Sequence, residues 1–156
     1  MGFFKKRTLL FSPMAGRTVP LAEVGDPAFS GEMLGKGIAI VPEDGRVFAP
    51  CDAVVETVFP TGHALTLATP WGGEILIHVG LDTVTLAGRG FAPQVAPGDR
   101  VTRGQLLLEA DLEAIRAGGL DPVTPVLLCN WQKFGKLRVL SKENVTEKDT
   151  IMELCL

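Results

Sequence analysis

The sequence predicts an all-β protein, a compact antiparallel β-sandwich or barrel with at most one or two short helical turns. The 18 Gly and 11 Pro of the 156 residues recur at short intervals and leave little room for long helices. Short runs rich in Val, Ile and Thr lie between these turn residues, as is typical of strands. Only residues 111–117 have a helical pattern, with Asp111 as the N-cap and Gly118-Gly119 as the stop signal.

Strands are expected along the whole chain. The predicted segments are 9–11, 38–41, 46–48, 53–59, 63–68, 74–80, one within 101–109, 123–130, 136–140 and 150–154, with further short segments at 83–86, 88–91 and 95–99. Glu43-Asp44-Gly45 is typical of a hairpin turn, and Asp26-Pro27 marks a turn. The clearest hairpin joins 63–68 to 74–80, because its connector, residues 69–73, is rich in turn residues.

The length suits one domain. We expect residues 8–156 to form it and residues 1–7 to be a short, flexible N-terminal segment. The segment is too short for a signal peptide. Its two Phe and three basic residues could instead contact an anionic membrane surface weakly.

Composition excludes several classes of protein. The net charge is -3 and the basic residues are scattered, so no nucleic-acid partner is expected. No apolar run approaches the roughly 20 residues that cross a bilayer, so no transmembrane segment is expected. The three cysteines are widely spaced and form no CxxC pair, which argues against a cysteine zinc site and agrees with reduced thiols in a cytoplasmic protein.

The chain contains two histidines, His63 and His78. If Thr69 lies opposite Glu74 in the hairpin, His63 lies opposite Gly80 and shares a face with His78. Diagonal neighbours on one face are about 7–8 Å apart, within reach of two imidazoles. A one-residue shift of the register would place the rings on opposite faces. This register also predicts that Leu65, Leu67 and Leu76 surround the histidines.

Two neighbouring imidazoles suit phosphoryl transfer, because one can attack phosphorus while the other donates N–H bonds to its oxygens. Thr61 is placed to bond an imidazole nitrogen, and Asp82 lies just beyond the strand, where it could orient a charged donor. Two alternatives stay open at this point. The histidines could be core residues, or they could supply half of a tetrahedral zinc site. A zinc hydrolase would need a third ligand and a general base, for which Asp82 is the only nearby candidate.

Six segments form a recognisable set of motifs: Thr61-Gly62-His63-Ala64, residues 74–84 with His78-Val79-Gly80-Leu81-Asp82-Thr83, residues 86–91, residues 98–107, Ser12-Pro13 with Gly16, and Asp26 with Phe29. These motifs resemble those of the glucose-family enzyme IIA component of the bacterial phosphoenolpyruvate-dependent sugar phosphotransferase system. The resemblance covers residues 8–154. Cys51, Ala53 and Leu76 depart from the pattern, and the Leu76 change is expected to alter partner preference.

The resemblance implies a phosphotransferase component that carries phosphate covalently. His78 would accept phosphate from HPr and pass it to the IIB domain of a sugar permease, with His63 stabilising the phosphoryl group. Thr61 would bond an active-site histidine, and Asp82 would lie at the edge of the site. Phe29, Ile40 and Leu76 would join the docking surface.

No cofactor would be required. In relatives, the two histidines can share zinc with a partner's carboxylate, and the unphosphorylated form can regulate other proteins. The rival hypothesis is therefore a non-catalytic regulatory or zinc-binding module that uses the same face. The motifs do not indicate the sugar.

Overall fold

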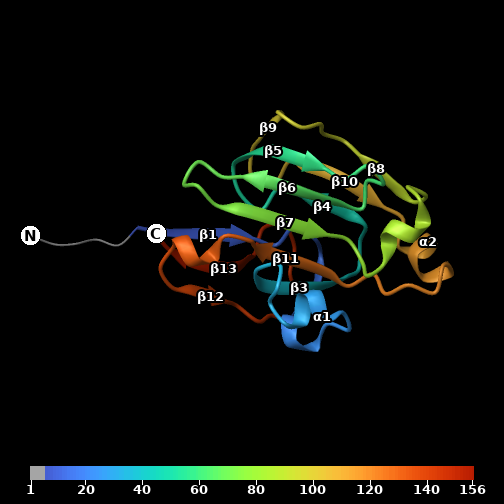
Figure 1. Cartoon of the computed structure of the whole chain (residues 1–156), viewed down its shortest axis with the longest axis horizontal. Coiled ribbons are helices and arrows are strands. Elements are labelled where there is room, and N and C mark those ends of the chain that lie inside the picture. Colours follow the sequence, from blue (N-terminus) through green and yellow to red (C-terminus); the bar gives the residue numbers. More distant parts are fainter. Residues whose placement is uncertain (1–5) are drawn as a thin grey trace, which may run out of the picture.

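The protein is described by a computed structural model over residues 6–156, which contains thirteen strands in three antiparallel sheets (Figure 1). The strands are β1 (Arg7–Phe11), β2 (Gly16–Pro20), β3 (Lys36–Pro42), β4 (Arg46–Phe48), β5 (Ala53–Val58), β6 (Ala64–Ala68), β7 (Glu74–His78), β8 (Phe91–Pro93), β9 (Arg100–Val101), β10 (Leu106–Ala110), β11 (Thr124–Leu128), β12 (Leu137–Val139) and β13 (Thr150–Cys155). The helical elements are α1 (Pro27–Ser30), α2 (Leu112–Ala117) and the 3-10 turns η1 (Leu21–Glu23), η2 (Thr83–Leu86) and η3 (Trp131–Lys133). The prediction of an all-β sandwich is confirmed.

The largest sheet separates two apolar clusters. Its strand order is β2-β3-β11-β7-β6-β5-β9. Its inner face packs in the main core with residues of the sheets β1-β13-β12 and β4-β10-β8. Because side chains alternate along a strand, Ile75 and Ile77 of β7 face this core, whereas Leu76 points to the outer face. We call the second cluster, on that outer face, the outer cluster; it comprises Leu21, Val24, Phe29, Ala39, Ala64, Leu76, Leu81, Val123 and Leu127.

Both α-helices begin at an aspartate N-cap. Asp111 accepts the N–H of Ala114 at 3.1 Å and starts α2, as the sequence predicts. Asp26 accepts the N–H of Ala28 at 2.9 Å and starts α1, with Pro27 in the first turn. The sequence predicted only a turn there. Helix α1 lies against the large sheet (Figure 1) and brings Phe29 into the outer cluster.

Several local predictions were wrong. Residues 88–91 and 95–99 form turns and irregular chain instead of extended segments, apart from Phe91, which begins β8. Strand β2 was not predicted. The turn at residues 43–45 does not close a hairpin, because β4 pairs with β10 whereas β3 pairs with β2 and β11. Residues 83–86 form η2 instead of extended chain, because Asp82 and Ala87 adopt left-handed conformations with φ of 57° and 54° and turn the backbone at both ends.

The two described ends of the chain lie together. Strand β1 starts at Arg7, which pairs with Cys155 of β13, and the N–H of Leu156 donates to the carbonyl of Lys6 at 2.8 Å. Residues 1–5 of the predicted N-terminal segment lie outside the described residues.

Candidate active site

His78 is the last residue of β7 and is half-buried on the outer face of the large sheet. Its Nδ1 lies 2.7 Å from the carbonyl oxygen of Gly80. A carbonyl only accepts hydrogen bonds, so Nδ1 carries the proton and donates it. The lone pair of the neutral ring is therefore on Nε2, which is the nitrogen left free to react.

His63 lies beside His78 and is only 3% exposed. The two ring centroids are 4.9 Å apart, and the rings meet edge to face at 80°. The Nδ1 atom of His63 lies 2.5 Å from the hydroxyl oxygen of Thr61. In addition, the N–H of Val79 donates to the carbonyl of His63 at 2.8 Å, which ties the two histidine segments together. The structure thus brings Thr61, His63 and His78 together.

The register that predicted this pair was nevertheless wrong by one residue. Ala68, not Thr69, lies opposite Glu74, and His78 lies opposite Ala64. In a regular ladder this register would send His63 to the other face. The rings meet because His63 precedes β6 and follows Gly62, whose φ of 72° turns the chain before the alternation begins.

Three phenylalanines enclose the histidine rings. Phe29 packs against His78 with centroids 5.1 Å apart, and Phe59 and Phe91 lie 5.4 and 6.2 Å from His63. The sequence analysis missed Phe59 and Phe91 as site residues, although Phe91 lies in a matching motif. The aromatic walls keep water from His63 and lower the local dielectric, which strengthens electrostatic interactions inside the site.

Burial, and secondarily the neighbouring His78, lower the pKa of His63 from 6.5 to about 4. Burial also lowers the pKa of His78, an effect opposed by its hydrogen bond to Gly80 and by the negative charges of Asp26 and Asp82. Both rings are therefore neutral at pH 7, and a neutral imidazole is a nucleophile.

The His63 ring is expected to titrate in an NMR experiment with a midpoint near 4, well below 6.5. The unfolded chain binds this proton at a higher pH than the folded chain does. Protonation of His63 therefore lowers the free energy of unfolding as the pH falls from 6.5 towards 4. A His78→Gln variant would assign the signals, because only two histidines are present. A midpoint near 6.5 for His63 would contradict the burial of this ring.

Two carboxylates, those of Asp26 and Asp82, raise the pKa of His78. Asp82 is exposed and follows Leu81 in a left-handed conformation at the start of η2. Asp26, the N-cap of α1, raises the pKa of His78 more than Asp82 does. The sequence analysis noted Asp26 only as a family landmark and missed its position at the site.

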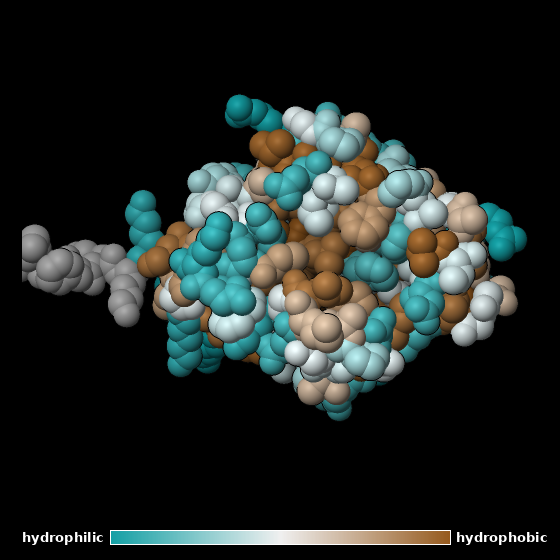
Figure 2. All heavy atoms as spheres, in the orientation of Figure 1, coloured by the Kyte–Doolittle hydropathy of each residue, from teal (hydrophilic) through white to brown (hydrophobic). Residues whose placement is uncertain are grey.

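The docking residues named from the sequence divide into two groups. Phe29 and Leu76 belong to the outer cluster, and Figure 2 shows an apolar hollow near the centre of that face. Ile40 and Leu65, in contrast, are 0% and 1% exposed in the main core and cannot contact a partner in this structure. Both predictions are corrected, because β3 and β6 turn these two side chains away from the face that carries Leu76.

An exposed apolar pair next to α1 was missed. Met33 and Leu34 follow this helix and are 79% and 44% exposed. Both residues are apolar, and neighbouring large apolar side chains that are exposed are typical of protein interfaces. The signal that could have found them is the pair of large apolar residues in a stretch of turn residues.

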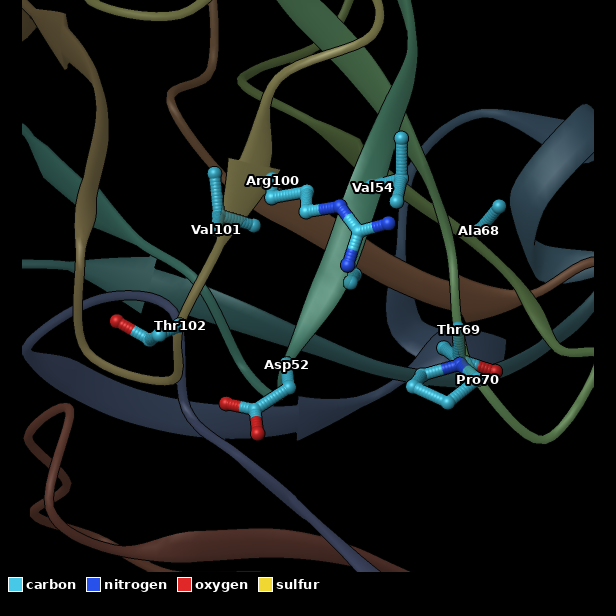
Figure 3. Close-up of a pocket in the computed structure, with 9 residues that line it drawn as sticks. Asp52, Val54, Ala68, Thr69, Pro70, Arg100, Val101 and Thr102 are labelled. Carbon is cyan, nitrogen blue, oxygen red and sulfur yellow. The ribbon is translucent and has the colours of Figure 1, made fainter.

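A second pocket, of about 480 Å³, lies away from both histidines between β5, β9 and the β6–β7 turn (Figure 3). Val54, Ala68 and Pro70 form much of its wall, and Arg100 reaches across β5 beside Val54. No histidine is among the residues that line this pocket.

Comparison with known proteins shows the family of the chain. The sequence profile of the family described as phosphoenolpyruvate-dependent sugar phosphotransferase system, EIIA 1, matches residues 8–134. The chain belongs to this family. Both histidines and the turn that follows His78 lie within the matched range.

Named relatives and a solved structure agree with the EIIA assignment. The chain is 42% identical over 139 residues to a "PTS system glucose-specific EIIA component" of Halalkalibacterium halodurans, covering 89% of this chain and 79% of that protein. It is 44% identical over 145 residues to a "PTS system beta-glucoside-specific EIIBCA component" of Dickeya chrysanthemi, covering 93% of this chain and 23% of that protein. The structure of glucose permease IIA from Mycoplasma capricolum superposes with a TM-score of 0.89 at 33% identity, over 98% of this chain and 99% of that one.

Several relatives are much longer than this EIIA chain. It spans between 21% and 24% of the EIIBCA and EIICBA proteins that it matches. In those relatives an EIIA region is therefore part of the same polypeptide as the B and C components named in their titles. Within residues 6–156 of this chain, no helix has the length and apolar character needed to cross a membrane.

Proposed function

We propose that this protein is a phosphohistidine carrier. His78 accepts a phosphoryl group from phosphorylated HPr and passes it to the IIB domain of a sugar permease, so the chain acts as a phosphotransferase component. The observation that supports this role best is a pair of neutral imidazoles 4.9 Å apart, of which His78 is partly accessible and His63 is enclosed.

The transfer exchanges one imidazole for another. Nε2 of His78 attacks phosphorus, and the P–N bond to the donor's histidine breaks, returning its electron pair to the donor ring. The proton on Nδ1 of His78 stays in place, hydrogen-bonded to the carbonyl oxygen of Gly80, which lies 2.7 Å from Nδ1. In the second transfer the acceptor's nucleophile attacks phosphorus, and the P–N bond to His78 breaks and returns its electron pair to Nε2. No proton has to leave His78 in either step.

His63 stabilises the charge of the phosphoryl oxygens. If the Thr61 hydroxyl donates to Nδ1 of His63, the proton of that neutral ring lies on Nε2. Nε2–H can then donate to a phosphoryl oxygen in the apolar enclosure formed with Phe59 and Phe91. Thr61 therefore acts through His63, by fixing its tautomer.

Partners would dock on the apolar hollow and its rim. Phe29 and Leu76 belong to the outer cluster, Met33 is exposed next to α1, and Asp26 and Asp82 add negative charge next to His78. Such a surface fits partners that present an apolar patch with basic side chains around their own reactive group. We infer that Leu76 adjusts this contact, because it belongs to the outer cluster and keeps 7% of its surface exposed.

Sugar specificity would lie outside this chain. Relatives of similar identity are named for different sugars: 42% for a beta-glucoside-specific protein and 40% for a glucose-specific one. The proposed site holds a phosphoryl group and a protein surface, and it has no role in contacting sugar. The permease that supplies the IIB domain would then determine the sugar.

The proposal is tested by incubating the folded chain with phosphoenolpyruvate, enzyme I and HPr. We expect one phosphoryl group per chain, attached by an acid-labile and base-stable bond, which is lost when a IIB domain and its sugar are added. No label on folded protein with an active donor would exclude the carrier function.

A zinc-dependent role needs a partner. The two imidazoles could supply two ligands, but residues 6–156 contain no group of three or more His, Cys, Asp or Glu side chains arranged for a metal. Zinc would therefore be held only where a partner adds a carboxylate. Tightly bound stoichiometric zinc in the isolated protein, together with an unlabelled His78, would favour the regulatory or zinc-binding module.

A further inference from the structure

The turn after β7 decides which nitrogen of His78 is free. The carbonyl of Gly80 accepts the Nδ1 proton at 2.7 Å, so its position determines the tautomer of the ring. Gly80 adopts a φ of 78°, and its carbonyl belongs to the peptide unit shared with Leu81. The N–H of Leu81 donates to the carbonyl of Asp121 at 2.9 Å and so orients this unit from one side.

The preceding peptide unit is held by a second hydrogen bond. The hydroxyl of Thr83 donates to the carbonyl of Val79 at 2.6 Å, and the Thr83 side chain is fully buried. The N–H of Val79 donates to the carbonyl of His63, so this one residue connects both histidine segments to Thr83. Because peptide units are planar, fixing the Val79 carbonyl also fixes the direction in which the chain enters Gly80.

The methyl group of Thr83 fills the space beneath Gly80. A Cβ added at Gly80 would lie 2.5 Å from this methyl group and 3.0 Å from the carbonyl oxygen of Asp121. Gly80 is therefore enclosed between two fixed neighbours. Thr83 contributes to the enclosure in two separable ways, because its methyl group makes the contact and its hydroxyl makes the hydrogen bond.

We infer that Thr83 is a positioning residue, whose buried hydroxyl holds the Gly80 carbonyl where it selects the reactive tautomer of His78. The inference rests on the proposed function, since it takes His78 as the phosphoryl acceptor. Thr83 itself does not touch the phosphoryl group. Its effect reaches the ring through Val79 and Gly80.

The test is Thr83→Val, which keeps the shape of the side chain and removes the hydroxyl. Thr83→Ser keeps the hydroxyl. Thr85→Val is the matched control, because the Thr85 hydroxyl makes a similar bond, 2.7 Å to the carbonyl of Asp82, but is exposed and is not among the nearest neighbours of Gly80. The readout is the 15N NMR signature of the two His78 ring nitrogens in the unphosphorylated protein.

We expect a single Nδ1–H tautomer in the wild type, in Thr83→Ser and in Thr85→Val. In Thr83→Val we expect a mixture of the two tautomers and a rate of phosphoryl acceptance lower by on the order of tenfold, because a small misplacement of a reacting group is costly. A stability loss alone would not distinguish positioning from packing, which is why the tautomer is measured.

A folded Thr83→Val variant with the wild-type tautomer would overturn the inference, and so would a mixture in Thr83→Ser. If Thr83→Val does not fold, Thr83→Ala is compared with Thr83→Ser, because both variants lack the methyl group and only the serine variant keeps the hydroxyl. The wild-type tautomer in a folded Thr83→Ala variant would again overturn the inference. Failure of the wild type to accept phosphate would instead exclude the proposed function and leave the tautomer result unaffected.

Discussion

Replacing His78 with glutamine is expected to abolish phosphoryl acceptance completely. In the proposed function the imidazole is the covalent nucleophile, and an amide nitrogen has no free lone pair with which to attack phosphorus. Glutamine has a similar size and keeps an N–H group that can donate to the Gly80 carbonyl, so the turn that follows β7 should persist. The measurement is transfer of labelled phosphate from phosphoenolpyruvate through enzyme I and HPr, followed by intact mass.

The matched control is the same substitution at His63, the other histidine of the chain. His63→Gln should still take up label if the two rings have the proposed roles. Full, acid-labile labelling of His78→Gln would assign the acceptor role to His63 and refute the division of roles. Agreement of the NMR spectra of both variants with the wild type would show that the fold is intact.

Onward transfer is expected to fall by on the order of 10² to 10³-fold in His63→Ala, while His78 still accepts the label. That is the typical loss when one donor to a developing oxyanion is removed. Phe59 and Phe91 enclose the His63 side chain, so a freely exchanging water molecule cannot take the place of its N–H donor. The measurement is the rate at which a IIB domain with its sugar removes label from the phosphorylated variant.

His63→Gln separates charge stabilisation from packing, because its amide retains an N–H donor of similar reach. Its transfer rate should lie between those of the wild type and His63→Ala. Wild-type rates in both variants would mean that His63 only fills space between the phenylalanines. Thr61→Val should reduce transfer less than His63→Ala, because it removes only the group that fixes the tautomer.

The sequence predicted the histidine pair for a reason that was only partly correct. Turn residues between 69 and 73 placed the two strands in one hairpin, which the pairing of β6 with β7 confirms. The exact register depends on the conformation of individual loop residues, which composition does not determine. Gly62 compensates for the shift, since its positive φ turns His63 towards His78.

Predicting which side chains face a partner was harder. Ile40 and Leu65 are apolar and lie in strands next to the site, but alternation turns them into the main core. Leu76 and Phe29 look equally apolar in the sequence and face outward. Without the pairing partners of each strand, the two faces of the large sheet cannot be distinguished, because both carry apolar residues.

The spacing of apolar residues in the sequence could not predict helix α1 or its N-cap. Four residues are too few to show a helical repeat, so Asp26-Pro27 read only as a turn. The consequence is that Asp26, whose charge acts on His78, was not recognised as part of the site. Residues that reach a site from a distant segment of chain are found only when the fold brings the segments together.

The unequal exposure of the two histidine rings also limits how the donor and the acceptor can bind. His63 is 3% exposed and walled in by phenylalanines, so partners can reach the reactive nitrogen only from the side of His78. Donor and acceptor must use this one opening in turn. The kinetics should therefore be ping-pong, with each partner competing against the other, and the chain can store a phosphoryl group between encounters. If the chain is the phosphohistidine carrier proposed above, the fraction of chains that carry phosphate would report the balance between supply from the donor and removal by the acceptor.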